Sequence, residues 1–238
     1  MVLSRVESFL HRVTCEIVPN VHQISFRNVN ITIIAEKELT IIDTGYRGYS
    51  SLIADFIRSL GRSLAETSLI IISHNYLDHS GGLAELRKLT RAKVAVHKAD
   101  ITVGGAQPPG KRGSLAVAFR SALYVKSIEV DIQLEGGEVL APLGGLEVIH
   151  TPGHTPGSIS LYSRKYKLLF VADALRRLER SVGLPSRLAS SDWKQALESI
   201  KRLALLDFDI LCFGHGPPLS RGAHARLLRL AEKLSRKL

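Results

Sequence analysis

The chain has 238 residues, of which 45% are hydrophobic and 23% are charged; this is enough to bury one core and predicts a single domain over residues 1–238. The net charge of +10 arises from lysines and arginines scattered without interleaved aromatic residues, so we expect a basic surface and no nucleic-acid partner. Two cysteines outside any Cys-x-x-Cys pair exclude a zinc site built from cysteines.

Membrane and export signals are not found in the sequence. No stretch reaches the roughly 18 uninterrupted apolar residues that a membrane helix needs. Residues 1–19 lack the apolar segment and cleavage site of a signal peptide. We therefore expect a soluble, cytoplasmic protein without a membrane partner. The single methionine, the two cysteines and the abundant arginines are typical of a thermophile.

The first part of the chain predicts alternating strands and helices. Runs of apolar and β-branched residues predict the strands, and apolar positions at helical spacing predict the helices. The strands are 21–26, 29–35, 39–43, 69–73 and 92–97, and the helices are 50–60 and 83–89. The run at 69–73 is continuously apolar, as expected for a strand buried on both faces.

Residues 99–127 show the weakest pattern, and the alternation resumes after them. A turn or loop is predicted at 106–113, and the helix-like segment 114–123 is a candidate lid over a site. Asp192, with Gln195 three residues later, resembles a capping box. The strands of this half are 146–150, 158–163, 167–173 and 208–213, and the helices are 192–204 and from 221 onward. The repetition predicts an α/β sandwich built from two similar halves.

Four motifs carry side chains that bind metals, and each follows a predicted strand. Because strand ends meet at one edge of a sheet, we expect these side chains to converge. The motifs are SHNYLDHSGG (73–82) with His74, Asp78 and His79; HTPGHTPGS (150–158) with His154; the strand end at Asp173; and FGHGPP (213–218) with His215. Imidazole and carboxylate groups are ligands for zinc, iron or manganese.

In this order, the motifs resemble the metallo-β-lactamase superfamily, and the resemblance covers nearly the whole chain, from the early strands through IIDTG (41–45) to GHG (214–216). It implies one metallo-β-lactamase-like domain with an α/β fold, a four-layer αβ/βα sandwich, and two metal positions at the sheet edge. The first motif of this family is His-x-His-x-Asp-His. Here Tyr76 stands in place of the second histidine.

The resemblance implies two half-sites that share Asp173. The complete half-site combines Asp173 with Asp78, His79 and His215. The other combines Asp173 with His74, His154 and the position that Tyr76 now occupies. Asp43 matches a position that orients ligands. His150 matches no ligand, and we expect it to form a hydrogen bond at its strand end.

Three interpretations of Tyr76 remain open. In the first, two metal ions bind, and the tyrosine is a weak ligand or is replaced by water. In the second, one ion binds, either at the complete half-site or at His74, His154 and Asp173, a set that resembles the iron site of persulfide dioxygenases. In the third, the site has been lost, and the chain is a non-catalytic binding protein.

The favoured function is a metal-dependent hydrolase that attacks a small-molecule ester, thioester, lactone or phosphoester with metal-activated water. One or two zinc ions are expected, with iron or manganese as alternatives. Asp78 is predicted to act as a ligand or general base, and the Tyr76 hydroxyl to stabilise an oxyanion. The alternatives are a mononuclear iron sulfur dioxygenase and the non-catalytic binding protein.

The length of the chain favours a small substrate. It leaves no room for the inserted domain of nucleic-acid-cleaving members, and the region after His215 is shorter than the helical domain with which glyoxalase II holds glutathione. Residues 176–180 (RRLER) are a candidate site for an anionic group on the substrate, or else a solvated surface run. The exposed face of the terminal helix is a candidate homodimer surface.

Overall fold

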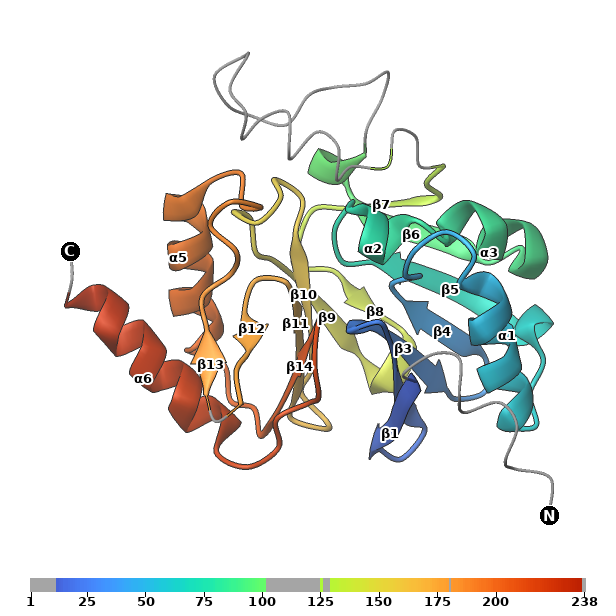
Figure 1. Ribbon diagram of the computed structural model, residues 1–238, viewed down its shortest axis with the longest axis horizontal. Coiled ribbons are helices and arrows are strands. Elements are labelled where there is room, and N and C mark those ends of the chain that lie inside the picture. Colours follow the sequence, from blue (N-terminus) through green and yellow to red (C-terminus); the bar gives the residue numbers. More distant parts are fainter. Residues whose placement is uncertain (1–11, 102–124, 126–128, 180, 237–238) are drawn as a thin grey trace.

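Two β-sheets pack face to face between outer helices in the computed structural model (Figure 1). The structure describes residues 12–101, 125, 129–179 and 181–236. The predicted turn at 106–113 and the candidate lid at 114–123 lie outside the described residues.

The first sheet contains seven strands, arranged side by side in chain order. The first four strands are antiparallel to one another, and the last four are parallel. The strands are β1 (Arg12–Val18), β2 (Val21–Phe26), β3 (Val29–Ala35), β4 (Leu39–Ile42), β5 (Thr67–Ile72), β6 (Lys93–His97) and β7 (Ile132–Leu134). Strand β1 was not predicted, although Val13, Cys15 and Ile17 alternate with polar residues; its side chains at 13–18 are exposed or half-buried.

The second sheet contains five strands in the order β14-β11-β10-β9-β8. Only the pair of β11 and β14 is parallel within it. The strands are β8 (Val139–Leu140), β9 (Leu146–His150), β10 (Ile159–Ser163), β11 (Leu168–Ala172) and β14 (Ile210–Phe213). A separate hairpin follows β11 and consists of β12 (Arg176–Arg177) and β13 (Val182–Gly183).

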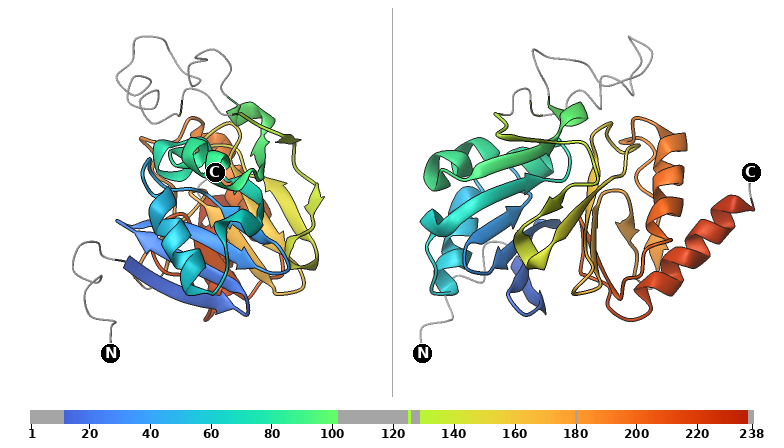
Figure 2. Two further views of the ribbon diagram at one scale, coloured as in Figure 1. Left: turned by 90° about the vertical axis from the view of Figure 1, so that its right-hand side faces the viewer. Right: turned by 180° about the vertical axis from the view of Figure 1, so that it is seen from behind.

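Helices cover the outer face of each sheet, as the views from the side and from behind show (Figure 2). Helices α1 (Ser50–Ser59) and α3 (Leu83–Thr90) lie on the first sheet, and α5 (Trp193–Leu203) and α6 (Ala223–Ser235) lie on the second. Short helical turns complete the described elements: α2 (Leu77–Ser80), η1 (Leu64–Glu66), η2 (Lys98–Asp100) and η3 (Pro142–Gly144). Within the described residues, none of the helices is long and apolar enough to cross a membrane.

The strands separate the core into layers because successive side chains point to opposite faces of a sheet. In the first sheet, Ile41 and Ile70 pack with the buried side chains of α1 and α3. Their neighbours Ile42 and Ile71 pack between the two sheets. A third buried cluster lies between the second sheet and α5 and α6. Three apolar interfaces therefore separate four layers, which confirms the predicted αβ/βα sandwich.

Helix α5 begins at the predicted residue. The Asp192 carboxylate accepts a hydrogen bond from the backbone N–H of Gln195 at 3.0 Å. The Gln195 side chain donates to the same carboxylate at 2.9 Å, so the interaction is an N-cap and not the reciprocal capping box.

Replacing this N-cap by Asp192→Ala is expected to lower the free energy of unfolding by about 1 kcal/mol, because the N–H of Gln195 loses its acceptor. Urea unfolding measures the change. Glu198→Ala on the same helix removes only an exposed ion pair with Lys201 and should change the midpoint much less. Equal losses in the two variants would contradict a capping role for Asp192.

Candidate metal centre

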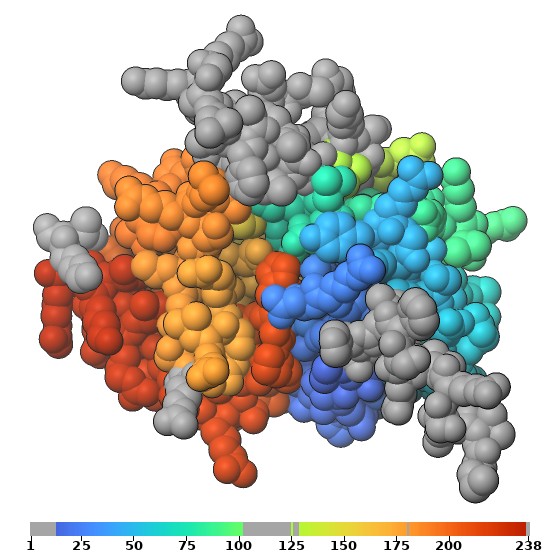
Figure 3. All heavy atoms as spheres, viewed as in Figure 1, coloured from blue at the N-terminus to red at the C-terminus, as the bar shows by residue number. Residues whose placement is uncertain are grey.

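Six side chains from distant parts of the chain converge at one edge of the two sheets. After β5 come His74, Asp78 and His79, and between β9 and β10 lies His154. Asp173 follows β11, and His215 follows β14. Donor atoms of His74, His79 and Asp173 lie within 4.8 Å of one another, and so do those of Asp78, His79 and His215. In Figure 3, the C-terminal half, in orange and red, lies against the N-terminal half, in blue and green.

Asp173 lies between the imidazoles of the two predicted half-sites. Its Oδ2 is 3.3 Å from Nε2 of His215 and 3.6 Å from Nε2 of His154. Its Oδ1 is 3.6 Å from Nε2 of His79. Asp78 is 3.5 Å from Nε2 of His215 and 3.6 Å from Nε2 of His79. The complete half-site is therefore assembled from carboxylate oxygens and Nε2 atoms.

Asp43 orients His79 as predicted. Its Oδ2 lies 2.8 Å from Nδ1 of His79, and its Oδ1 accepts the backbone N–H of Ser73 at 2.8 Å. Because a carboxylate only accepts, Nδ1 carries the proton and Nε2 points toward the cluster. Burial opposes protonation of His79, but Asp43 and the neighbouring carboxylates outweigh it and raise its pKa to about 10. The same negative charge favours a cation at this place.

Ser73 orients His74, and the sequence interpretation missed this residue. The Ser73 hydroxyl donates to Asp43 Oδ2 at 2.7 Å and lies 3.1 Å from Nδ1 of His74. Since the hydroxyl proton goes to the carboxylate, Ser73 accepts from Nδ1–H of His74. Nε2 of His74 is then unprotonated, and its lone pair can bind a metal ion. The position of Ser73 at the end of a buried strand was the available signal.

His215 is held from the first sheet, and His154 is held differently. Nδ1 of His215 lies 2.7 Å from the carbonyl oxygen of Asn28, which accepts its proton. The side chain of Asn30, two residues after Asn28, donates a hydrogen bond to the carbonyl oxygen of Gly216 at 2.6 Å. This bond connects the segment of Asn28 to the loop of His215. Among the described residues, neither ring nitrogen of His154 has a hydrogen-bond partner.

Buried polar atoms without partners mark the centre. Within the described part of the chain, Nε2 of His74, Nε2 of His79, both ring nitrogens of His154 and Oδ1 of Asp173 are buried and form no hydrogen bond. Burial lowers the pKa values of His74 and His154, so both imidazoles are neutral. Burial also opposes the ionised form of Asp173, but His215 and the other imidazoles hold its pKa well below its usual range. The neutral imidazoles of His74 and His154 beside the ionised Asp173 fit a divalent metal ion.

Gly214 allows Asp173 and His79 to approach each other. A Cβ at position 214 would lie 2.1 Å from Oδ1 of Asp173 and 2.8 Å from Cε1 of His79. The glycine of the FGHGPP motif is therefore needed for close packing of two predicted ligands.

The Gly214→Ala variant is expected to displace Asp173 and to weaken zinc binding by roughly 10- to 100-fold, as changes next to metal ligands do. Competition with a chelator of known affinity measures the dissociation constant. Gly48→Ala is a control, because a Cβ there meets nothing within 4 Å, although its positive φ also strains the backbone. Unchanged zinc affinity in Gly214→Ala would contradict the steric argument.

The Tyr76 side chain packs against both imidazoles of the incomplete half-site. It is 3% exposed, and its ring meets those of His74 and His154 edge to face at 5.2 and 4.9 Å. Its hydroxyl donates to the carbonyl oxygen of Ala189 at 2.6 Å. This geometry directs the phenolic proton to the backbone. The predicted roles of Tyr76 as ligand and oxyanion donor stay predictions that this arrangement does not favour.

Two other predicted residues have simple structural roles. His150 confirms its expected role at the strand end, since its Nε2 lies 2.9 Å from the carbonyl oxygen of Pro156. In the basic run, Arg176 donates to the carbonyl of Leu184 at 2.8 Å. Arg177 donates to backbone carbonyls of the same hairpin. Binding of an anion by this run stays a prediction.

Comparison with known proteins agrees with the fold. The sequence profile of the Metallo-beta-lactamase superfamily matches residues 24–215. The probable metallo-hydrolase YflN of Bacillus subtilis (strain 168) is 26% identical over 245 residues, which cover 92% of this chain and 93% of that protein. The hydroxyacylglutathione hydrolase of Yersinia pestis is 31% identical over 196 residues, which cover 81% of this chain and 63% of that enzyme.

Solved structures show the same fold. A metallo-beta-lactamase of Cronobacter sakazakii with a HARLDQ motif has a TM-score of 0.72 at 22% identity, covering 94% of this chain and 93% of that one. A subclass B3 metallo-beta-lactamase of Bradyrhizobium japonicum has a TM-score of 0.69 at 23% identity, covering 94% and 91%. The chain belongs to the metallo-β-lactamase superfamily. Membership and the named relatives support a metal-dependent hydrolase.

Proposed function

We propose that this protein hydrolyses a small-molecule ester, thioester, lactone or phosphoester with the help of one zinc ion. The observation that carries the proposal is the complete donor set of Asp78, His79, His215 and Asp173, with its buried, unpartnered atoms. When bound there, a divalent ion lowers the pKa of a water molecule and polarises the reacting carbonyl or phosphoryl oxygen.

The protein's own residues prepare the site for this reaction. Asp43, Ser73 and the Asn28 carbonyl hold the Nδ1 atoms of three histidines, so that their Nε2 atoms point inward before any ligand arrives. Asp78 is the more exposed of the two site carboxylates, at 21% against 16% for Asp173. We assign it to the mouth of the site, where it is a ligand or accepts a proton from water.

Tyr76 supports the binding of a single ion. The superfamily's second histidine is absent, and the hydroxyl in its place is bonded to Ala189. His74 and His154 then line the site beside the complete half-site. Iron or manganese would fit the same nitrogen and oxygen donors.

A persulfide dioxygenase is the second candidate function. The unpartnered nitrogens of His74 and His154, with Asp173 at 3.6 Å from His154, favour it. Two histidines and one carboxylate are the ligand set of mononuclear iron oxygenases. The location of the metal and its identity therefore distinguish the two functions.

Elemental analysis of protein purified without chelators tests the proposal. We expect about one equivalent of zinc per chain, with turnover of p-nitrophenyl acetate, a γ-lactone, an acyl thioester or bis(p-nitrophenyl) phosphate that is lost on chelation and restored by zinc. One equivalent of iron with oxygen uptake on a low-molecular-weight persulfide would replace the hydrolase by the dioxygenase. No metal after reconstitution would overturn both and leave a non-catalytic binding protein.

A further inference from the structure

A buried carboxylate outside the ligand set joins the two loops that carry His74 and His154. Asp100 ends the turn η2 after β6 and is 1% exposed. Its Oδ2 accepts the backbone N–H of Asn75 at 2.9 Å and the hydroxyl of Thr155 at 2.6 Å. Its Oδ1 accepts the backbone N–H of Gly157 at 2.6 Å. Two of these donors, Asn75 and Thr155, directly follow a predicted metal ligand in the chain.

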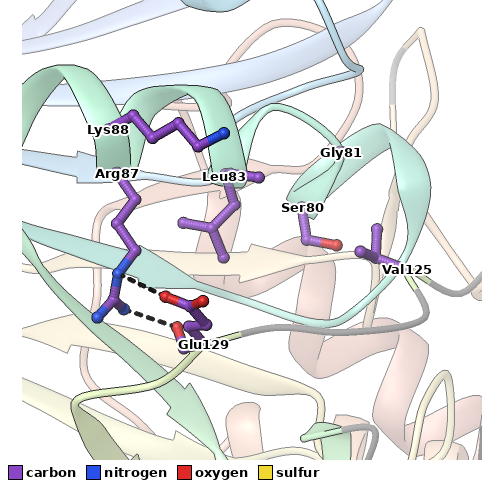
Figure 4. A pocket seen from close by; sticks show the side chains of 8 residues that line it. Ser80, Gly81, Leu83, Arg87, Lys88, Val125 and Glu129 are labelled. Carbon is purple, nitrogen blue, oxygen red and sulfur yellow. Dashed lines mark hydrogen bonds and ion pairs between the residues drawn. The ribbon is translucent and has the colours of Figure 1, made fainter.

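The Asn75 side chain strengthens the connection on the side of His74. Its Nδ2 donates to the carbonyls of Asp100 at 3.0 Å and Val125 at 3.1 Å. Its Oδ1 accepts the hydroxyl of Ser80 at 2.9 Å. Figure 4 shows Ser80 and Val125 at one end of a pocket beside α2 and α3, in which Arg87 pairs with Glu129. This pocket contains no residue of the metal centre.

The second Pro-Gly turn of the HTPGHTPGS motif is shaped to receive Asp100. A Cβ at position 157 would lie 2.6 Å from Cβ and Cγ of Asp100. Glycine is therefore required where the carboxylate meets the backbone. A hydrogen bond within the turn also stabilises it, since Oγ of Ser158 accepts the backbone N–H of Thr155 at 3.0 Å.

His154 needs this support more than the other histidines of the site. The Nδ1 atoms of His74, His79 and His215 each have a protein partner. Among the described residues, His154 has none at either nitrogen. Its ring is therefore placed by packing and by the backbone of its own turn, which Asp100 holds through the Gly157 backbone N–H and the Thr155 hydroxyl.

We propose that Asp100 is a positioning residue that fixes the turn of His154 against the loop of residues 73–82, which carries the ligands Asp78 and His79 as well as His74, and thereby sets the metal affinity of the centre. The proposal rests on the proposed metal-dependent function. A shift of one loop against the other would change the separation of the two imidazoles, whose ring centres are 4.8 Å apart.

Variants of Thr155 test the proposal without altering a charge. Thr155→Val keeps the shape and removes the hydroxyl that bonds to Asp100 and lies 2.8 Å from Oγ of Ser158, whereas Thr155→Ser keeps the hydroxyl. We expect Thr155→Val and Asp100→Asn to weaken zinc binding by roughly 10- to 100-fold in competition with a chelator, as changes of residues that orient ligands do. Thr155→Ser should restore the wild-type dissociation constant. In the cobalt-substituted protein, the visible absorption bands should shift in the first two variants and not in the third.

A matched control separates positioning from general destabilisation. Asp131 also accepts a backbone N–H of the first sheet, that of Val94 at 2.9 Å, but within the described residues its hydrogen bonds and ion pairs join it to Val94 and Arg87, outside the metal centre. Asp131→Asn should lower the urea midpoint and leave zinc affinity and the cobalt spectrum unchanged. If Thr155→Val also loses stability with unchanged zinc affinity and cobalt spectrum, the positioning role of Asp100 is overturned. If the wild-type protein itself binds no metal, the proposed function is wrong, and the role of Asp100 in metal affinity is overturned with it.

Discussion

Asp173→Asn is expected to abolish hydrolysis and metal binding together. The carboxylate lies within 3.3 to 3.6 Å of Nε2 atoms from His215, His79 and His154, so it is shared by both half-sites. The amide has nearly the same shape but no charge. Its N–H group would face an imidazole nitrogen that is expected to bind the metal. Since losing one partner of a buried charged group costs about 3–5 kcal/mol, zinc affinity should fall by roughly 10²-fold or more.

Zinc content after gel filtration and turnover of the best substrate measure this effect. Asp207→Asn provides the control, because that carboxylate is 74% exposed and forms an ion pair with Lys167 on the surface, away from the metal centre. Circular dichroism establishes that both variants fold. An Asp173→Asn protein that keeps its zinc and its turnover would remove Asp173 from the centre.

Tyr76→His is expected to add a second equivalent of bound zinc. The substitution restores the superfamily's His-x-His-x-Asp-His motif and supplies a third imidazole beside His74 and His154. It also removes the hydrogen bond to Ala189, which should lower the free energy of unfolding by about 1 kcal/mol. Calorimetric titration of the apoprotein with zinc measures the stoichiometry directly.

Tyr76→Phe separates the phenol from the ring. It keeps the edge-to-face contacts with His74 and His154 and loses only the hydroxyl. We expect it to bind as much zinc as the wild-type protein and to lose about 1 kcal/mol of stability. Two equivalents in the wild type, with one lost in Tyr76→Phe, would show instead that the tyrosine is a ligand.

Much of the fold was predictable because it depends on local periodicity. Strand residues such as Ile41 and Ile42 are apolar at successive positions, as expected for strands buried on both faces, and the structure places them in two different interfaces. The edge strand β1 has no continuous apolar run, since only Val13, Cys15 and Ile17 alternate with polar residues and its side chains are exposed or half-buried, and it was missed.

From the sequence by itself, the motifs pointed to the family, and the resemblance to that family implied the four layers and the six candidate ligands, because motifs are properties of neighbouring residues. Only the tertiary structure decided what holds those ligands. Tyr76 bonds to a carbonyl 113 residues away, and Asp100 bonds to a glycine 57 residues away. Such partners share no pattern in the chain. They meet because the packing of two sheets brings loops from separate strand ends to one edge, and a hydrogen bond depends on that final placement.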